Sequence, residues 1–325
     1  MRRLRNPLIT WLVWASAAVV LAASPVSPGA SATVGEAFIT NQNGDSLTIV
    51  ELAGLKVLAE IPIGGKPAGI AMSGDGKQAF ITAPESKELI VVDAVTRQIA
   101  KRFKVGEGPL GVAAHPTSGR VYVADWYSHQ LSVVDPAAGT IVAKISVGDS
   151  PSGVAVTPDG RLVLTADRDS NAVSIIDAST NERIASVPVG QRPFGITIDA
   201  GGQRAYTANV ASDDVSVIDI ATRKVLGTVK VDERPYAVAL AGQRAFVTNQ
   251  YASTVSVIDV ASLKVVQTIP VGDHPEGIAT DPAGAHVYVA CWFDNVLMRI
   301  DTAKMAVDGQ VAVGDGPRAF GLFLR

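Results

Sequence analysis

The sequence predicts an all-β protein, a seven-bladed β-propeller of four-stranded antiparallel blades. Three observations predict this fold: a repeat of about 42 residues, four short apolar runs in each repeat, and complementary half-repeats at the two ends. Each repeat starts at a proline that closes a short turn, and these prolines are Pro67, Pro109, Pro151, Pro193, Pro235, Pro275 and Pro317. Their spacing is constant except between Pro235 and Pro275, and a period kept this strictly is typical of a repeat architecture.

The four apolar runs of each repeat have the length and punctuation of strands and not of helices. In the repeat after Pro193 the runs, named A to D in chain order, are expected at 194–198, 204–208, 215–219 and 224–231. Turns between A and B, such as Thr-Pro-Asp-Gly at 157–160, use residues that supply a fixed or positive φ. The one shorter interval between prolines is explained by a shorter A–B turn at 240–243.

Two positions recur in the repeats for structural reasons. A small residue stands two places after each proline, because seven A strands converge on one axis and a larger side chain would crowd its neighbours. These residues are Gly69, Gly111, Gly153, Gly195, Ala237, Gly277 and Ala319. An acidic residue ends run C and is expected to accept hydrogen bonds from backbone N–H groups of the C–D turn. These acids are Glu51, Asp93, Asp135, Asp177, Asp219, Asp259 and Asp301.

The two ends of the repeat array predict a closed ring. Residues 37–41 (Ala-Phe-Ile-Thr-Asn) match the B run at 245–249, so the first repeat lacks its A strand. Residues 317–324 form a surplus A strand after the last repeat. The C-terminal strand is therefore expected to complete the N-terminal blade, which leaves no large unpaired sheet edge. One propeller domain is expected over residues 33–325.

Residues 1–32 have the pattern of a secretory signal peptide. Arg2, Arg3 and Arg5 precede an uncharged stretch at 8–23, and Ala-Ser-Ala at 30–32 offers a cleavage site. An uncleaved anchor is the alternative, but the apolar stretch falls short of the roughly 20 residues that span a bilayer. We therefore expect a Sec-type signal, a periplasmic or secreted protein and no membrane attachment after cleavage.

The net charge limits which binding partners are expected, and the single cysteine limits which covalent cross-links are expected. The formal net charge is −3, and loss of the signal would make it more negative by three, which counts against general binding of nucleic acid. Cys291 is the only cysteine, so no internal disulfide is expected, and its thiol is expected to be a small buried apolar group. We expect a monomer without a cofactor.

The sequence resembles bacterial and archaeal proteins with tandem YVTN-type β-propeller repeats. The resemblance rests on Phe-Val-Thr-Asn at 246–249, Thr-Val-Ser-Val-Ile-Asp at 254–259, Tyr-Val-Ala-Asp at 122–125 and the Val-Gly-x-x-Pro-x-Gly turns. It covers residues 33–325 and implies the propeller fold. For function it implies several classes, namely exported binding or scaffold-like proteins, surface-layer components and relatives of propeller lactonases, because fold does not carry function.

A candidate site is expected on the face formed by the D–A turns and B–C loops, where the repeats differ most. Residues that flank the prolines are small or apolar in two repeats but become charged and aromatic from Arg192 to Arg318. The loop after strand B adds further aromatic residues. The candidate ligand-binding residues are Trp126, Arg192, Phe194, Arg234, Tyr236, Tyr251, His274, Glu276, Trp292 and Arg318.

Two interpretations of these residues are open. Aromatic rings beside arginines can stack on a planar or sugar-like ligand while guanidinium groups fix an acidic group. Alternatively, the residues merely cap the ring, with solvated arginines and with aromatic rings that cover blade edges. No metal site is predicted, because the four histidines fall on different strands and faces. A cation site built from Asp125, Asp167 and Asp169 is an open alternative.

Catalysis has one candidate constellation. The sequence contains no Gly-x-Ser-x-Gly elbow and no phosphate-binding glycine loop. His274 or Glu276 could act as a base and Arg318 could stabilise an oxyanion, as a lactone hydrolase requires. The leading hypothesis is a non-catalytic exported propeller that binds an unidentified ligand or protein through its loop face. Lactone hydrolysis is the alternative, and single-stranded nucleic-acid binding is the weaker one.

Overall fold

A computed structural model describes residues 35–325. The expected signal peptide, residues 1–32, lies outside the described residues. Strands and turns make up the described part of the chain, and no helix in it is long and apolar enough to cross a membrane.

The strands fall into seven blades in chain order. The first three blades contain β1 (Glu36–Asn41), β2 (Ser46–Glu51) and β3 (Lys56–Pro62); β4 (Gly69–Met72), β5 (Gln78–Ala83), β6 (Glu88–Asp93) and β7 (Gln98–Lys104); and β8 (Pro109–Ala114), β9 (Val121–Asp125), β10 (Gln130–Asp135) and β11 (Thr140–Ser146). The next two contain β12 (Pro151–Val156), β13 (Leu162–Asp167), β14 (Ala172–Asp177) and β15 (Glu182–Pro188); and β16 (Pro193–Ile198), β17 (Arg204–Asn209), β18 (Asp214–Asp219) and β19 (Lys224–Lys230). The last strands are β20 (Pro235–Ala241), β21 (Arg244–Asn249), β22 (Thr254–Asp259) and β23 (Lys264–Pro270); β24 (Pro275–Thr280), β25 (His286–Cys291), β26 (Val296–Asp301) and β27 (Ala306–Ala312); and the closing β28 (Phe320–Leu322).

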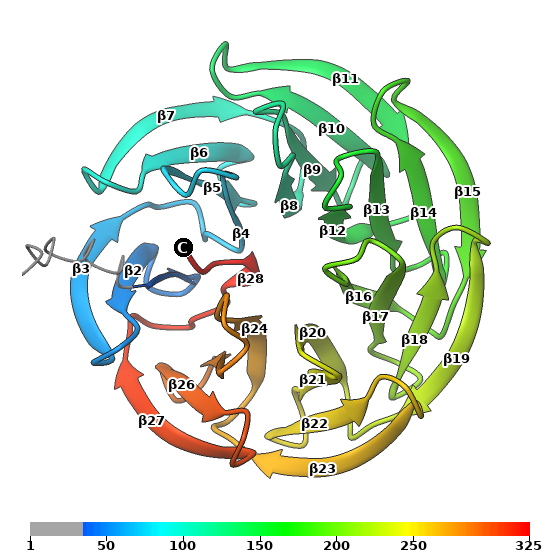
Figure 1. Ribbon diagram of the computed structural model, residues 1–325. Coiled ribbons are helices and arrows are strands. Elements are labelled where there is room, and N and C mark those ends of the chain that lie inside the picture. The colour runs from blue at the N-terminus through cyan, green and yellow to red at the C-terminus, as the bar shows by residue number, and fades with distance from the viewer. Residues whose placement is uncertain (1–34) are drawn as a thin grey trace, which may run out of the picture. The chain divides into compact units, whose positions relative to one another are not determined.

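The blades stand in a ring around a central axis, which confirms the predicted seven-bladed propeller (Figure 1). The first strand of a blade lies nearest the axis and the fourth, such as β15 or β19, forms the rim. Neighbouring strands in the blade of β16 to β19 are antiparallel, as they are in the other blades. The bounds expected for this blade agree with the observed strands to within one residue at each end.

The tail closes the ring as the sequence predicts. The backbone N–H of Phe38 donates to the carbonyl of Phe323 at 2.9 Å, and that of Arg325 donates to the carbonyl of Glu36 at 2.9 Å. The regular part of this strand, β28, is shorter than the expected 317–324, because a positive φ at Ala319 (44°) precedes it. The tail also contacts the next blade, where β28 pairs in parallel with β4. It therefore joins two blades.

The two recurring positions have the structural roles expected of them. A Cβ on Gly69 would lie 2.1 Å from the carbonyl oxygen of Leu110 on the next inner strand. The acids that end the third strands accept backbone N–H groups of the following turn, as Asp301 does from Lys304 at 2.9 Å. Glu51 accepts the N–H of Gly54 in the same way.

Buried side chains fill the spaces between neighbouring blades, as sheets packed face to face require. One such cluster combines Tyr206 and Val217 of one blade with Val238 and Val247 of the next. In every blade the pairing of the third and fourth strands shifts at a bulge near its middle. A bulge twists the outer strand, so the rim of the ring is a poor template for edge-to-edge pairing.

Candidate functional site

The D–A turns and B–C loops lie on one face, as expected, because they hydrogen-bond to each other. The N–H of Gln250 donates to the carbonyl of Arg234 at 2.9 Å, and the N–H of Trp292 donates to that of His274 at 3.0 Å. Both carbonyls belong to pre-proline residues with positive φ, 57° at Arg234 and 51° at His274. The N–H of Arg234 is in turn held by the carboxylate of Asp213, 2.9 Å away in the preceding blade. These bonds, two between backbone groups and one to a side-chain carboxylate, hold the loop face in place.

The residue after each proline is directed toward the axis at this face. In β16, β20 and β24 the register with the next strand shifts between the proline and the third residue after it, so the residue after the proline leaves the regular ladder. The side chain of Arg318 is 17% exposed, and the other members of the set are buried. In order around the ring they are Ala68, Leu110, Ser152, Phe194, Tyr236, Glu276 and Arg318. The large members stand on neighbouring blades, as the sequence predicts.

Three aromatic rings fill the axis just inside this face. The ring of Phe194 lies 4.5 Å from Tyr236 and 4.9 Å from Phe320, measured between centroids, and Tyr236 lies 5.7 Å from Phe320. All three side chains are buried. Trp126 flanks the group, with its ring 6.2 Å from Phe194. We call Phe194, Tyr236 and Phe320 the aromatic plug.

A buried ion pair adjoins the aromatic plug. Glu276 Oε2 lies 3.2 Å from Nε of Arg318, and Gln250 Nε2 donates to Glu276 Oε1 at 2.6 Å. Arg318 also donates to the hydroxyl of Tyr236 at 2.6 and 2.9 Å and to Gln42 Oε1 at 2.9 Å. Side chains from the last two blades, the first blade and the closing tail thus meet in one hydrogen-bonded group. Such a group is strongly coupled, because the loss of one partner leaves a buried charge uncompensated.

Burial governs the ionisation of this group. It raises the pKa of the Glu276 carboxyl, and the positive charge of Arg318 opposes the rise. Burial likewise raises the pKa of the Tyr236 hydroxyl above its ordinary value. The tyrosine is therefore neutral at neutral pH, and its hydroxyl accepts the hydrogen bonds of Arg318.

Further out on the same face, four side chains form a continuous row that alternates between turns and B–C loops. The guanidinium of Arg234 stacks on the Tyr251 ring at 4.5 Å. The His274 ring lies 5.4 Å from Tyr251 and 4.4 Å from Phe293. Tyr251 is 56% exposed and Phe293 is 59% exposed. We call Arg234, Tyr251, His274 and Phe293 the aromatic strip.

The remaining predicted residues lie at the margins of these two groups. Arg192 is exposed, and its backbone N–H donates to the side chain of Asn171 at 2.8 Å. Trp292 lies under Arg318, with 5.8 Å from the guanidinium carbon to the ring centroid. Trp126 is stacked in the same way by Arg168, at 5.3 Å. The structure therefore divides the predicted arc into a buried group at the axis and an exposed aromatic strip.

Four residues of these groups are missing from the predicted set. Gln42 and Gln250 hold the ion pair, and both directly follow the asparagine that ends a B strand, so an alignment of the loops could have singled them out. Phe293 occupies the same loop position as Tyr251. The sequence does not indicate a role for Phe320, because the other repeats have ordinary aliphatic core residues at the same position.

The three aspartates considered for a cation already have protein partners. Asp125 accepts the N–H of Gly108 at 2.9 Å, and Asp167 accepts the hydroxyl of Thr165 at 2.7 Å. Asp169 accepts the hydroxyl of Ser150 at 2.7 Å. Within residues 35–325 no group of three potential metal-ligating acids, histidines or cysteines is found.

Cys291 is fully buried, as the sequence predicts. Burial raises the pKa of its thiol to about 12. The thiolate, which is the reactive form, is therefore scarce at neutral pH.

Family models match two parts of the chain. A model described as a YNCE-like beta-propeller matches residues 29–120, and a model described as an NHL repeat matches residues 107–134. No curated protein sequence matches the chain.

Solved structures with the same fold are similar over most of the chain. Hydrazine synthase of Kuenenia stuttgartiensis is 23% identical with a TM-score of 0.71, over 78% of this chain and 88% of that one. A functionally unknown protein from Desulfotomaculum acetoxidans DSM 771 is 16% identical with a TM-score of 0.76, over 87% and 98%. Dihydro-heme d1 dehydrogenase NirN, in complex with DHE, is 20% identical with a TM-score of 0.62, over 87% and 64%.

These identities are low, so the structural similarity extends to the fold alone. The two family models and the ring of seven blades agree on one architecture. The chain is a β-propeller repeat protein.

Proposed function

We propose that this protein is a non-catalytic binding protein that engages its ligand or partner through the D–A and B–C loop face. The aromatic strip carries the proposal. Tyr251 and Phe293 are both more than half exposed, yet each ring is held against a neighbouring side chain on the adjacent turn. Exposed aromatic rings held in place offer a large contact area, and little side-chain freedom remains to be lost on binding.

The surroundings of the aromatic strip favour a neutral ligand with hydroxyl groups. Its turns and loops carry exposed carboxylates, which accept hydrogen bonds and repel anions. These residues are Glu233, Asp273 and Asp294. A sugar fits both features, because its apolar face stacks on aromatic rings and its hydroxyls donate to carboxylates. The same carboxylates disfavour the phosphates of a single-stranded nucleic acid.

Lactone hydrolysis has less support from the geometry. Glu276 is 5% exposed, and its two carboxylate oxygens face Gln250 and Arg318. His274 is turned toward Asp273, with 2.8 Å between Nδ1 and Oδ1. A general base must reach the proton that it removes, and this carboxylate is enclosed by protein groups.

We also propose a repeat type, a location and an oligomeric state for this protein, each from its sequence. The motifs at 246–249 and 254–259 support a YVTN-type propeller. The pattern of residues 1–32 supports export to the periplasm or the medium. We further propose that the exported protein acts as a monomer.

The proposal is tested on an array of neutral oligosaccharides with the wild type and two variants. Tyr251→Ala/Phe293→Ala removes both exposed rings of the aromatic strip. Tyr127→Ala is the matched control, because Tyr127 occupies the same loop position in another blade and is 70% exposed. We expect the double variant to lose at least about tenfold in affinity for any glycan that the wild type binds, since each stacked ring contributes about 1 kcal/mol beyond its buried area. The control should bind within about twofold of the wild type.

Two results would count against the aromatic strip. If the double variant binds the same glycans as tightly as the wild type, the ligand lies elsewhere. If the wild type binds no neutral glycan, the sugar assignment is wrong. Thermal unfolding of each variant verifies that the propeller is intact.

A further inference from the structure

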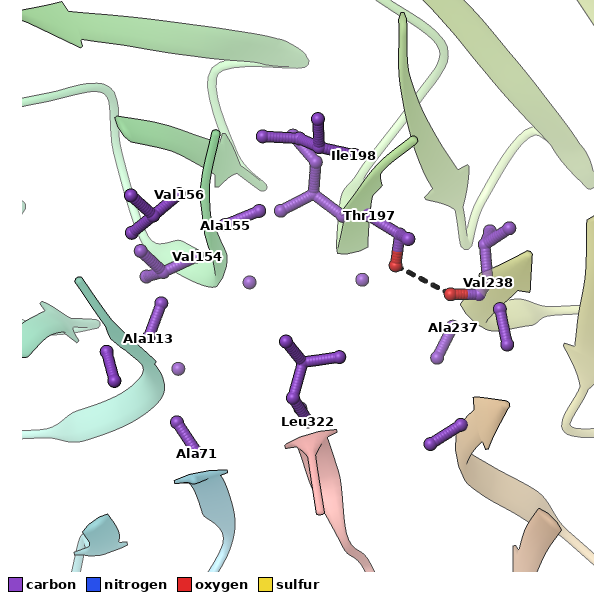
Figure 2. A pocket seen from close by; sticks show the side chains of 18 of the residues that line it. Ala71, Ala113, Val154, Ala155, Val156, Thr197, Ile198, Ala237, Val238 and Leu322 are labelled. Atoms are coloured by element: carbon purple, nitrogen blue, oxygen red, sulfur yellow. Dashed lines mark hydrogen bonds between the residues drawn. The ribbon is translucent and has the colours of Figure 1, made fainter. Parts of the chain in front are cut away.

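The central channel contains a cavity of about 500 Å³ on the side of the aromatic plug that faces away from the loop face. It is lined by inner strands of six blades and by β28. Figure 2 shows Leu322 standing in the middle of this space, with Ala71, Ala113 and Ala155 on one side and Thr197 on another. Pockets for small molecules typically measure about 300–1,000 Å³, so the volume suits one such ligand.

The cavity is closed at one end and open at the other. Phe320, a member of the aromatic plug, lines the cavity and separates it from the loop face. At the opposite end Leu322 is 68% exposed, and the neighbouring turn residues Gly74 and Ala200 are exposed too. A ligand could therefore enter from the A–B turns without any displacement of the plug.

The lining is apolar with few polar groups. Thr197 is already committed, because its hydroxyl donates to the carbonyl of Val238 at 2.6 Å (Figure 2). Thr280 Oγ1 is buried and has no hydrogen-bond partner among the described residues. This atom is itself covered by neighbouring protein atoms, so it does not face the open space of the cavity.

The charges at the lining decide the class of ligand. Asp199 is the one acid among the described lining residues, and none of these residues is basic. One oxygen of the Asp199 carboxylate already accepts the N–H of Gln203 at 2.7 Å. A buried anion would therefore lack a countercharge, which is costly, whereas a neutral molecule would not.

We propose that this cavity binds a small neutral apolar molecule. Its apolar surface covers Leu322 and the alanines. The site is independent of the loop face, because the aromatic plug lies between the two. A medium-chain alcohol has this chemistry, and the carboxylate of the same chain length does not.

Binding is measured on the purified protein with the neutral fluorescent probe N-phenyl-1-naphthylamine. We expect the probe to bind and 1-decanol to displace it. Decanoate at pH 8 should be at least about tenfold weaker than decanol, because its charge is either buried without a partner or held at the open end near Asp199. Failure of the probe to bind, or equal displacement by decanol and decanoate, overturns the proposal.

Two substitutions test whether the ligand binds in the cavity. Leu322→Arg puts a charge in its centre at an exposed position, so the fold tolerates the change while probe binding falls by at least about tenfold. Thr280→Val is the control: the Thr280 hydroxyl is covered and does not face the cavity, so decanol and the probe should bind as they do to the wild type. Unchanged probe and decanol binding in Leu322→Arg refutes this location. The Tyr251→Ala/Phe293→Ala variant should bind the probe as the wild type does, which separates this site from the proposed glycan site.

Discussion

At the scale of single residues, one repeat position carries very different chemistry in successive blades. The residue after the proline is small or aliphatic in three blades, aromatic at Phe194 and Tyr236, and charged at Glu276 and Arg318. The backbone geometry that directs these side chains toward the axis is shared, so the differences among them accumulate in one place. There they form the aromatic plug and the buried ion pair.

The ion pair yields a prediction for Arg318→Met. We expect this substitution to lower the free energy of unfolding by about 3 kcal/mol, because it leaves the buried Glu276 carboxylate without its cation. Urea-induced unfolding measures the loss. Lys87→Met is the matched control, because the Lys87–Glu107 pair is at least half exposed and should contribute less than about 0.5 kcal/mol.

The deficit of Arg318→Met should also depend on pH. Burial raises the pKa of Glu276, and removal of the opposing charge of Arg318 raises it further. The folded variant then holds a proton that the unfolded chain releases, so its stability falls as the pH rises above the unfolded pKa of about 4.3. Urea titrations at pH 5 and pH 8 should show the larger deficit at pH 8. An equal deficit at both values contradicts this account.

At the scale of elements, the turn between the third and fourth strands is the most uniform part of the repeat. Its aspartate accepts one or two backbone N–H groups, as at Asp259 and Asp301. Hydrogen bonds from Lys304, first of all from its backbone N–H, lower the pKa of Asp301 to about 2. The pKa of Asp259 is lowered by the N–H of Ser262. The same local bonds therefore stabilise the ionised acid in separate blades.

The lowered pKa of Asp301 in this turn predicts that the folded protein loses stability in acid. A carboxyl whose pKa is lower in the folded state stabilises the protein above the unfolded pKa, and this contribution disappears as the pH falls through the folded pKa. We expect Asp301→Asn to be less stable than the wild type at pH 5 and to approach it near pH 2, the pKa of Asp301. Urea-induced unfolding across this range is the measurement.

Because the turns are local, the effects of Asp259→Asn and Asp301→Asn should add in the double variant. A deficit of Asp301→Asn that stays constant down to pH 2 would show that the charge is not what stabilises the turn.

At the scale of the whole molecule, stability depends on the closure of the ring by the tail. The side chain of Phe323 is fully buried in a cluster with Phe38 and Ile49 of the first blade. Backbone bonds join the tail to β1, and β28 pairs with β4. A few residues at the end of the chain thus hold the two blades at the start of the ring.

Closure is tested by two adjacent substitutions. Phe323→Ala should lower the free energy of unfolding by about 3 kcal/mol, because it removes a large fully buried side chain at the closure. Leu322→Ala is the control: it is the next residue in the chain but 68% exposed, so it should change stability by less than about 0.5 kcal/mol. Thermal or urea-induced unfolding measures both. If the two substitutions have equal effects, the tail does not close the ring as described.

The sequence by itself determined the repeat, the strands, the closure and the roles of the recurring glycines and aspartates. These features follow from contacts within one repeat or between neighbouring repeats, which recur in each blade and leave a periodic trace in the chain. The sequence also placed Tyr236, Glu276 and Arg318 on one face in neighbouring blades.

Only the tertiary structure decided which of these side chains meet. It placed Arg318 against Glu276 and Tyr236, it brought Phe320 into the aromatic plug, and it separated the exposed aromatic strip from that buried group. It also revealed the cavity around Leu322. The physical reason is that these contacts join side chains that differ from repeat to repeat, some on neighbouring blades and some, such as Phe320 and Phe194, far apart in the chain. They depend on bulges, side-chain directions and the packing left after closure, and none of these repeats in the sequence.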